Sequence, residues 1–187
     1  MGSEMCIRDS SYTEAEEKEL EQVAKAYRNF LNVGKTEREC VTQIIREARA
    51  AGYESLEEKT AKGEKLKAGD KVYTVGMKKI IALFHIGQDD ISEGMNILGA
   101  HIDSPRLDVK QNPLYEDTDL AYLDTHYYGG VKKYQWVTLP LAIHGVVVKK
   151  DGSTAEVNIG EDEDDPIVYI TVSYTHLRAH ETLRHLV

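Results

Sequence analysis

The N-terminal third of the chain repeats apolar residues at the spacing of amphipathic helices. The capping-box pattern Thr13-x-x-Glu16 predicts the start of a helix, and Gly34 predicts its end. The apolar residues between them share one helical face: Leu20, Val23, Tyr27, Phe30 and Leu31. We therefore expect a long helix with charged residues on its outer face.

A second helix is predicted directly after the first. It begins at the capping-box pattern Thr36-x-x-Glu39 and closes near Gly52. Its inward positions follow the helical period: Val41, Ile44, Ile45 and Ala48. The polar stretch 63–69 contains turn residues and separates this helical region from the remainder of the chain.

From Lys71 onward the period changes from that of helices to that of strands. Met95–Asp103 is predicted as a strand that is buried on both faces, because its centre reads Ile-Leu-Gly-Ala. Asp151-Gly152 predicts a hairpin turn. The full set of predicted strands is Val72–Val75, Lys79–Ile86, Met95–Asp103, Leu120–Tyr128, Val137–Lys149, Ala155–Ile159 and Ile167–Thr171. Two helices followed by a growing sheet indicate an α/β or α+β fold, with a β-rich lobe from about Leu107.

The two ends of the chain differ from its body. Residues 1–10 and 172–187 have neither helical nor strand periodicity. A DNA string that encodes 172–179 has a reverse complement that translates to residues 2–9, and it resembles a transposon-end sequencing adapter. We therefore interpret both ends as translated adapter and exclude them from reasoning about the fold. The natural body is then about 11–171, with its true C-terminus missing; a natural inverted repeat is the alternative.

Composition excludes several classes of function. The net charge of −9 disfavours nucleic acid as a partner, because little would neutralise phosphates. No apolar run approaches the roughly 20 residues of a membrane span, and the N-terminus lacks a signal-peptide pattern. The two cysteines, Cys6 and Cys40, do not suggest a disulfide framework. These features predict a soluble, acidic, cytoplasmic protein.

The strongest candidate for chemistry is His101-Ile102-Asp103, at the end of the predicted buried strand. Residues i and i+2 of a strand face the same side, so an imidazole and a carboxylate would lie together at the sheet edge where α/β proteins bind ligands. A carboxylate often orients a zinc-binding histidine. H-x-D alone is a weak signal, and by itself a structural His–Asp hydrogen bond at a strand end explains it better than a metal site does.

The sequence around this pair resembles the aminopeptidase I family of zinc metallopeptidases, which includes the aspartyl aminopeptidases. Residues 94–108, GMNILGAHIDSPRLD, resemble the first metal-binding motif of that family. Three further stretches follow in the family's order: QNPLYE at 111–116, HYYGGVKKYQWVTLPLAIHGVV at 126–147 and GEDEDDPIVYIT at 160–171. The likeness covers nearly the whole body and is nearer to the neutral-residue branch than to the aspartyl branch.

The resemblance implies a two-zinc exopeptidase that acts on peptides through a metal-activated water. By position, His101 matches the first zinc ligand, and Asp103 matches the active-site carboxylate that supports the metal. The implied fold is a mixed sheet flanked by helices, with residues 11–106 in the catalytic domain and 107–171 beginning an inserted assembly lobe. Homo-oligomers, typically dodecamers, are implied. The other zinc ligands and the general base match later parts of the family, so we expect this chain alone to be inactive.

Other candidates have simpler interpretations. His85, in an apolar strand, suits a core or edge position, and His126 suits a structural role better than an active-site role. His144 suits packing or a lobe interface. The acidic run 161–165 lacks the spacing of a calcium loop, and Gly129-Gly130 lacks that of a P-loop.

A different class of function stays open beside the enzyme. Residues 107–171 could form a non-catalytic β-rich assembly module in which His101 is structural. Another metallopeptidase family with an H-x-D motif is a closer alternative, which the SPRLD and GGVKKYQW segments disfavour.

Overall fold

The computed structural model describes residues 12–137, 139–162 and 164–165, and these divide into two units, Met1–Ile102 and Asp103–Val187. The two adapter-like ends and the predicted strand Ile167–Thr171 lie outside the described residues. Among those residues, no helix combines the length and the apolar character that crossing a membrane requires.

Both predicted N-terminal helices are confirmed, together with their capping boxes. Helix α1 spans Glu14–Val33 and helix α2 spans Glu37–Ala50. In each, the N-cap threonine accepts a hydrogen bond from the backbone of the glutamate three residues on, and that glutamate's carboxylate accepts one from the threonine backbone. The reciprocal pair satisfies amide groups that a helix start otherwise leaves without partners.

The apolar face of α1 is exposed, although its helical pattern suggested that it would pack against another element. No residue of α1 is buried, and Val23 and Tyr27 are both 62% exposed. The inward face of α2, in contrast, reaches the core, with Val41 2% and Ala48 5% exposed. The 3.6-residue period therefore predicts which side of a helix is apolar, but burial depends on an element that covers that side.

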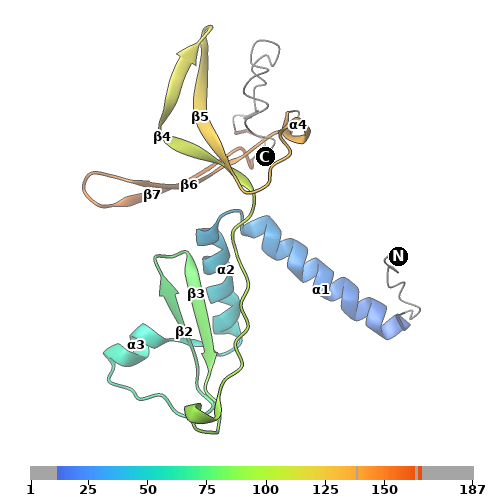
Figure 1. Ribbon diagram of the computed structural model, residues 1–187, viewed down its shortest axis with the longest axis vertical. Coiled ribbons are helices and arrows are strands. Elements are labelled where there is room, and N and C mark those ends of the chain that lie inside the picture. The colour runs from blue at the N-terminus through green and yellow to red at the C-terminus, as the bar shows by residue number, and fades with distance from the viewer. Residues whose placement is uncertain (1–11, 138, 163, 166–187) are drawn as a thin grey trace, which may run out of the picture. The chain divides into compact units, whose positions relative to one another are not determined.

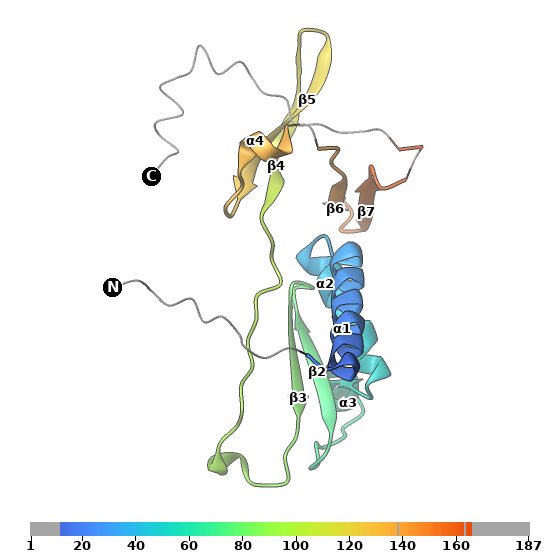
Figure 2. The same cartoon turned by 90° about the vertical axis from the view of Figure 1, so that its right-hand side faces the viewer.

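The first unit is built on a three-stranded sheet in the order β1-β2-β3, of which Figure 1 labels β2 and β3. Strands β2, Lys71–Gly76, and β3, Ile80–His85, form an antiparallel hairpin, and the short β1, Glu54–Ser55, pairs parallel to β2. Helix α2 lies beside this hairpin (Figure 2). The small core where they meet consists of Cys40, Val41, Ala48, Val72 and Tyr73.

A third helix, α3, spans Leu56–Ala61 and was not predicted. Ser55 is its N-cap, and the Ser55 side chain accepts a hydrogen bond from the backbone of Glu58. The Ser-x-x-Glu spacing was therefore an available signal of the same kind as the two capping boxes.

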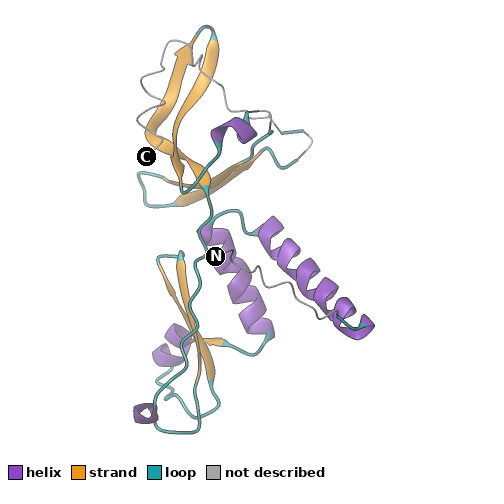
Figure 3. Ribbon diagram, turned by 45° about the vertical axis from the view of Figure 1, so that its right-hand side comes forward, coloured by secondary structure: helices purple, strands orange, loops and turns teal. Residues whose placement is uncertain are grey.

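Residues 94–105 form no strand, so the predicted strand Met95–Asp103 is wrong for this structure. After the short 3-10 helix η1, Ile91–Glu93, the chain runs as loop to Arg106 (Figure 3). Ile97 is 81% exposed and Leu98 is 100% exposed. A strand exists only through hydrogen bonds to a neighbour, and no described strand pairs with this stretch.

The second unit contains two antiparallel hairpins. Strand β4, Arg106–Asp117, pairs with β5, Leu120–Tyr128, and strand β6, Ile143–Val148, pairs with β7, Thr154–Ile159. The predicted strand Leu120–Tyr128 and the turn at Asp151-Gly152 are confirmed. The predicted strand Val137–Lys149 begins too early, because the helix α4, Lys133–Trp136, and a turn precede β6.

Candidate functional site

The two residues of the H-x-D pair fall at the boundary between the units. His101 is exposed and belongs to the first unit, whereas Asp103 is half-buried and begins the second. The segment that carries them is loop rather than the expected strand end. The alternation of a strand therefore does not bring the two side chains to one face here.

Asp103 has a well-defined partner within the second unit. The hydroxyl of Tyr128, the last residue of β5, donates a hydrogen bond of 2.8 Å to Oδ2 of Asp103. The two residues are 25 positions apart in the sequence. The β4–β5 hairpin makes this possible, because its register pairs Arg106 directly with Tyr128 and so returns the chain to the point where it left Asp103.

The ring of Tyr128 is held by the residue opposite it. The guanidinium carbon of Arg106 lies 4.2 Å from the centre of the Tyr128 ring. Cations at this distance over an aromatic face are attracted by the ring quadrupole. Arg106 is itself oriented by Asp108, since its Nε donates a hydrogen bond of 2.7 Å to Oδ1 of Asp108.

Backbone geometry at Gly129 completes this arrangement. Gly129 has a φ of +73°, and a Cβ built there would lie 3.4 Å from the Cα of Pro105. The chain therefore turns away from Tyr128 in the left-handed region while it packs against Pro105. Glycine adopts this conformation without the steric cost that other residues carry.

One face of the β4–β5 hairpin thus carries an ordered row of polar side chains. Directly opposite residues of an antiparallel pair share a face, and the register pairs Arg106 with Tyr128 and Asp108 with His126. His126 Nε2 lies 3.8 Å from Oδ2 of Asp108. The row runs from Asp103 through Tyr128, Arg106 and Asp108 to His126. We name these five residues the Asp103 row.

The structure assigns simple roles to the other candidate histidines. His85 lies at the exposed end of β3, an edge strand of the described sheet, so the edge interpretation fits and a core position does not. The side chain of His144 is 10% exposed, and its Nε2 lies 3.0 Å from Oε1 of Glu161. His144 therefore joins β6 to the acidic loop, which agrees with a packing role.

The acidic loop closes on itself through Asp165, whose Oδ2 accepts a hydrogen bond of 2.8 Å from the backbone of Gly160. Among the described residues, no group of three or more His, Cys, Asp or Glu side chains is arranged to hold a metal ion. A catalytic zinc needs about three protein ligands. His101 has the right donor chemistry for one of them, but the described residues do not complete a zinc centre.

A polar hollow of about 240 Å³ in the first unit is lined by residues that form ion pairs with one another. Among the residues that line it is Lys59, whose Nζ lies 2.7 Å from Glu54 and 3.4 Å from Glu64. The hydrogen bond to Glu54 is the main reason that the pKa of Lys59 is raised. These ion pairs tie α3 to the neighbouring loop and strand.

The sequence analysis assigns no role to three members of the row, Arg106, Asp108 and Tyr128. All three lie inside the motifs quoted for the family resemblance. The available signal was the two-residue period of the predicted strand Leu120–Tyr128, which places His126 and Tyr128 on one face. The partner strand and its register were not predicted, so the opposing residues could not be identified.

Comparison with known proteins supplies the wider context. The profile of a family described as “Aminopeptidase I zinc metalloprotease (M18)” matches residues 30–184. A protein of Clostridium acetobutylicum named “Probable M18 family aminopeptidase 1” is 55% identical over 170 residues, which cover 91% of this chain and 37% of that protein. The chain therefore spans little more than a third of that relative.

Solved structures give the same picture. The crystal structure of aminopeptidase I from Borrelia burgdorferi B31 is 40% identical, with a TM-score of 0.78, over 85% of this chain and 38% of that one. Aminopeptidase I from Clostridium acetobutylicum matches at 55% identity with a TM-score of 0.73, over 90% of this chain and 37% of that one. The mixed α/β architecture is thus similar to part of these structures.

Proposed function

Because the chain belongs to the aminopeptidase I (M18) family of zinc metalloproteases, we propose that it is part of an enzyme that removes N-terminal residues from peptides. The observation that carries this proposal is the family match over residues 30–184, joined with 55% identity to an M18 relative. The chain contributes only part of the machinery, since it spans 37% of that relative.

His101 is the proposed zinc ligand of this chain. Its imidazole is the donor type that zinc prefers, and it stands in the GAHIDSPRLD stretch whose resemblance to the family's first metal motif suggested the role. Asp103 is the proposed supporting carboxylate. When bound, zinc supplies a Lewis acid and lowers the pKa of a coordinated water to about 7. The contribution of Asp103 is to help fix the geometry of the site.

The remaining parts of the proposal follow the family resemblance. The complete enzyme would hold two zinc ions per active site, and its other ligands and general base would come from residues beyond those described. Residues 107–171 would begin an inserted β-rich lobe that mediates homo-oligomer assembly, with a dodecamer as the proposed form. The proposed location is the cytoplasm. The 187-residue chain is expected to be inactive alone, because one histidine cannot hold a catalytic zinc.

The test compares the full-length protein that carries this sequence with its His101→Ala variant. The expected result is about two zinc ions per chain by elemental analysis and metal-dependent release of N-terminal residues from peptides. His101→Ala should lose zinc and lower the rate of peptide hydrolysis by at least about a hundredfold. A full-length protein that binds no zinc yet forms intact oligomers would favour the non-catalytic assembly module instead.

A further inference from the structure

We propose that Tyr128 is a positioning residue of the active site, holding the carboxylate of Asp103 through its hydroxyl while Arg106 holds its ring. This inference rests on the proposed function, because it takes Asp103 to be the carboxylate that supports the metal. It adds a residue and a physical role that the family match does not supply.

The first support is the hydrogen bond itself. At 2.8 Å, the Tyr128 hydroxyl donates to Oδ2 of Asp103. Bonds from neutral donors to ionised carboxylates are stronger than bonds between neutral groups. A carboxylate can accept at both oxygens, so a bond at Oδ2 orients the group without using its whole accepting capacity.

The second support is that Arg106 restrains the ring of Tyr128, although Tyr128 is 42% exposed. Arg106 lies 4.2 Å over its ring and is fixed in turn by its 2.7 Å bond to Asp108. Gly129 follows Tyr128 in the chain, and its φ of +73° permits the sharp turn that packs the backbone against Pro105. A side chain restrained in this way loses little further conformational freedom when its hydroxyl bonds Asp103.

The third support is that Asp103, which accepts the hydrogen bond from Tyr128, is close in sequence to the proposed zinc ligand His101. Asp103 is two residues from His101 in the sequence, and Ser104-Pro105 follows in loop. A loop does not hold a carboxylate as firmly as a strand does. A hydrogen bond from the end of the paired strand β5 would compensate for this, because β5 is fixed by its ladder to β4. Partners that orient groups around a metal typically change metal affinity about 10- to 100-fold when removed.

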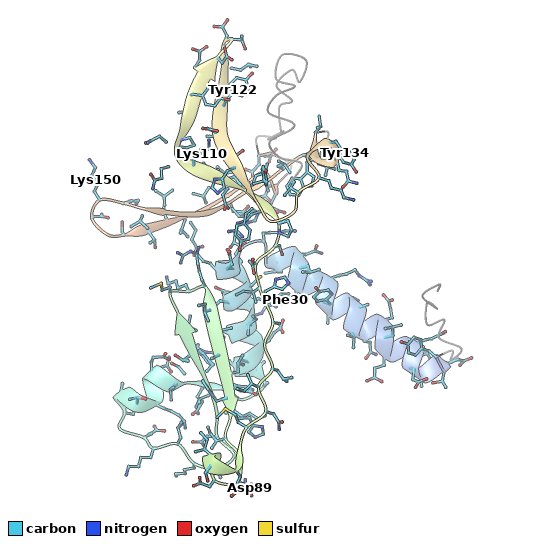
Figure 4. The ribbon with its side chains drawn as sticks, viewed as in Figure 1. Phe30, Asp89, Lys110, Tyr122, Tyr134 and Lys150 are labelled. Carbon is cyan, nitrogen blue, oxygen red and sulfur yellow. The ribbon has the colours of Figure 1, made fainter. Side chains whose placement is uncertain are left out.

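The experiment measures zinc affinity in the full-length protein by competition with a chelator. Tyr128→Phe removes the hydroxyl and keeps the ring under Arg106, so zinc affinity should fall about 10- to 100-fold. The matched control is Tyr122→Phe, on the same strand nearer the hairpin turn (Figure 4). Tyr122 stacks on Tyr115 at 5.2 Å through its ring, which phenylalanine retains, so its zinc affinity should stay that of the unchanged protein.

Two further readouts separate positioning from simple folding. The thermal unfolding of the metal-free protein should be the same for Tyr128→Phe and Tyr122→Phe. In the cobalt-substituted protein, the visible absorption bands should shift for Tyr128→Phe but not for Tyr122→Phe, because they report the geometry around the metal. A loss of zinc affinity that only follows a loss of metal-free stability would overturn the positioning role.

Asp103→Asn distinguishes failure of this inference from failure of the proposed function. If Asp103→Asn weakens zinc binding and Tyr128→Phe does not, Tyr128 has no positioning role and the proposed function stands. If Asp103→Asn and His101→Ala both bind zinc as the unchanged protein does, the proposed function itself fails. If Tyr128 positions Asp103, the two substitutions act through one contact and their effects should not add. Adding Tyr128→Phe to the Asp103→Asn variant should then lower zinc affinity by less than Tyr128→Phe lowers it in the unchanged protein.

Discussion

Gly129 has a backbone conformation that favours glycine, and it lies directly beside Tyr128 of the candidate site. Its positive φ and its approach to Pro105 follow immediately after Tyr128. Gly130, its neighbour, has open space around the position of a Cβ. Two adjacent glycines of the same sequence motif thus have different structural requirements, which the motif alone does not reveal.

Gly129→Ala is expected to destabilise the second unit by about 1–2 kcal/mol, because an L-residue with a Cβ is strained in the left-handed region. Gly130→Ala should change stability by less than about 0.5 kcal/mol. Chemical denaturation followed by the fluorescence of Trp136, the only tryptophan in the sequence, measures both. Equal effects of the two substitutions would contradict the strain described for Gly129.

Cys40 offers a residue-scale prediction about pH. Burial raises the pKa of its thiol above the ordinary 9.0, and the charges of Glu39 and Glu37 add to the effect. A raised pKa in the folded state means that the folded protein keeps the proton more strongly than the unfolded chain. The stabilisation is therefore present below pH 9.0 and is lost as pH rises through the folded-state pKa.

The measurement compares the unchanged protein with Cys40→Ala between about pH 8 and pH 10. Stability of the unchanged protein should fall more steeply over this range than that of Cys40→Ala. Cys6 is present in both proteins, so its titration cancels in the comparison. Parallel pH profiles would show that the Cys40 thiol titrates alike in the folded and unfolded states.

Among the elements, the two helix starts marked by capping boxes, those of α1 and α2, followed directly from the sequence. A capping box involves residues three positions apart, so nothing distant is needed to form it. Strands followed less well. Leu120–Tyr128 matched β5, but the strand expected over Val137–Lys149 shortened to Ile143–Val148. An apolar run marks where a strand can form, whereas its ends depend on which residues find hydrogen-bonding partners on the neighbouring strand.

Thr36→Ala tests the value of such a local signal. It removes the side chain that accepts from the backbone of Glu39, so the first unit should lose about 1 kcal/mol of stability. Thr42→Ala, on an exposed position of the same helix, is the matched control and should be neutral or slightly stabilising, since alanine favours helix. Denaturation followed by far-ultraviolet circular dichroism gives both values; similar losses for the two would argue against a special role of the cap.

At the scale of the whole molecule, the exposed apolar stretch near the C-terminal end of the first unit is the most informative feature. Leu98 is fully exposed and Ile97 nearly so. Consecutive exposed apolar residues usually mark a surface that another segment or molecule covers. Within the proposed enzyme, we expect another segment to cover this stretch.

Leu98→Ala distinguishes the two situations. In the 187-residue chain it should change stability by less than about 0.5 kcal/mol, because an exposed side chain has little to lose. In the full-length protein it should cost about 2–5 kcal/mol, the usual range for a buried leucine. Denaturation of both forms with and without the substitution checks this, and equal small effects would mean that Leu98 stays exposed in the longer protein as well.

The sequence by itself determined what depends on near neighbours. The two capping boxes, the ends of α1 and α2 and the hairpin turn at Asp151-Gly152 all arise from residues a few positions apart. The order of the motifs also identified the family, because a profile compares residue types and needs no contacts. The candidate roles of His101 and Asp103 came from that likeness and await the experiments above.

Only the tertiary structure decided which residues face one another. Tyr128 meets Asp103 across 25 positions because the β4–β5 register returns the chain to its starting point. Residues 94–103 have the composition of a buried strand, yet the described part of the chain pairs no strand with them and they remain loop. The physical reason is the same in both cases: hydrogen bonds and burial between distant segments are properties of pairs, and one segment's sequence specifies only half of each pair.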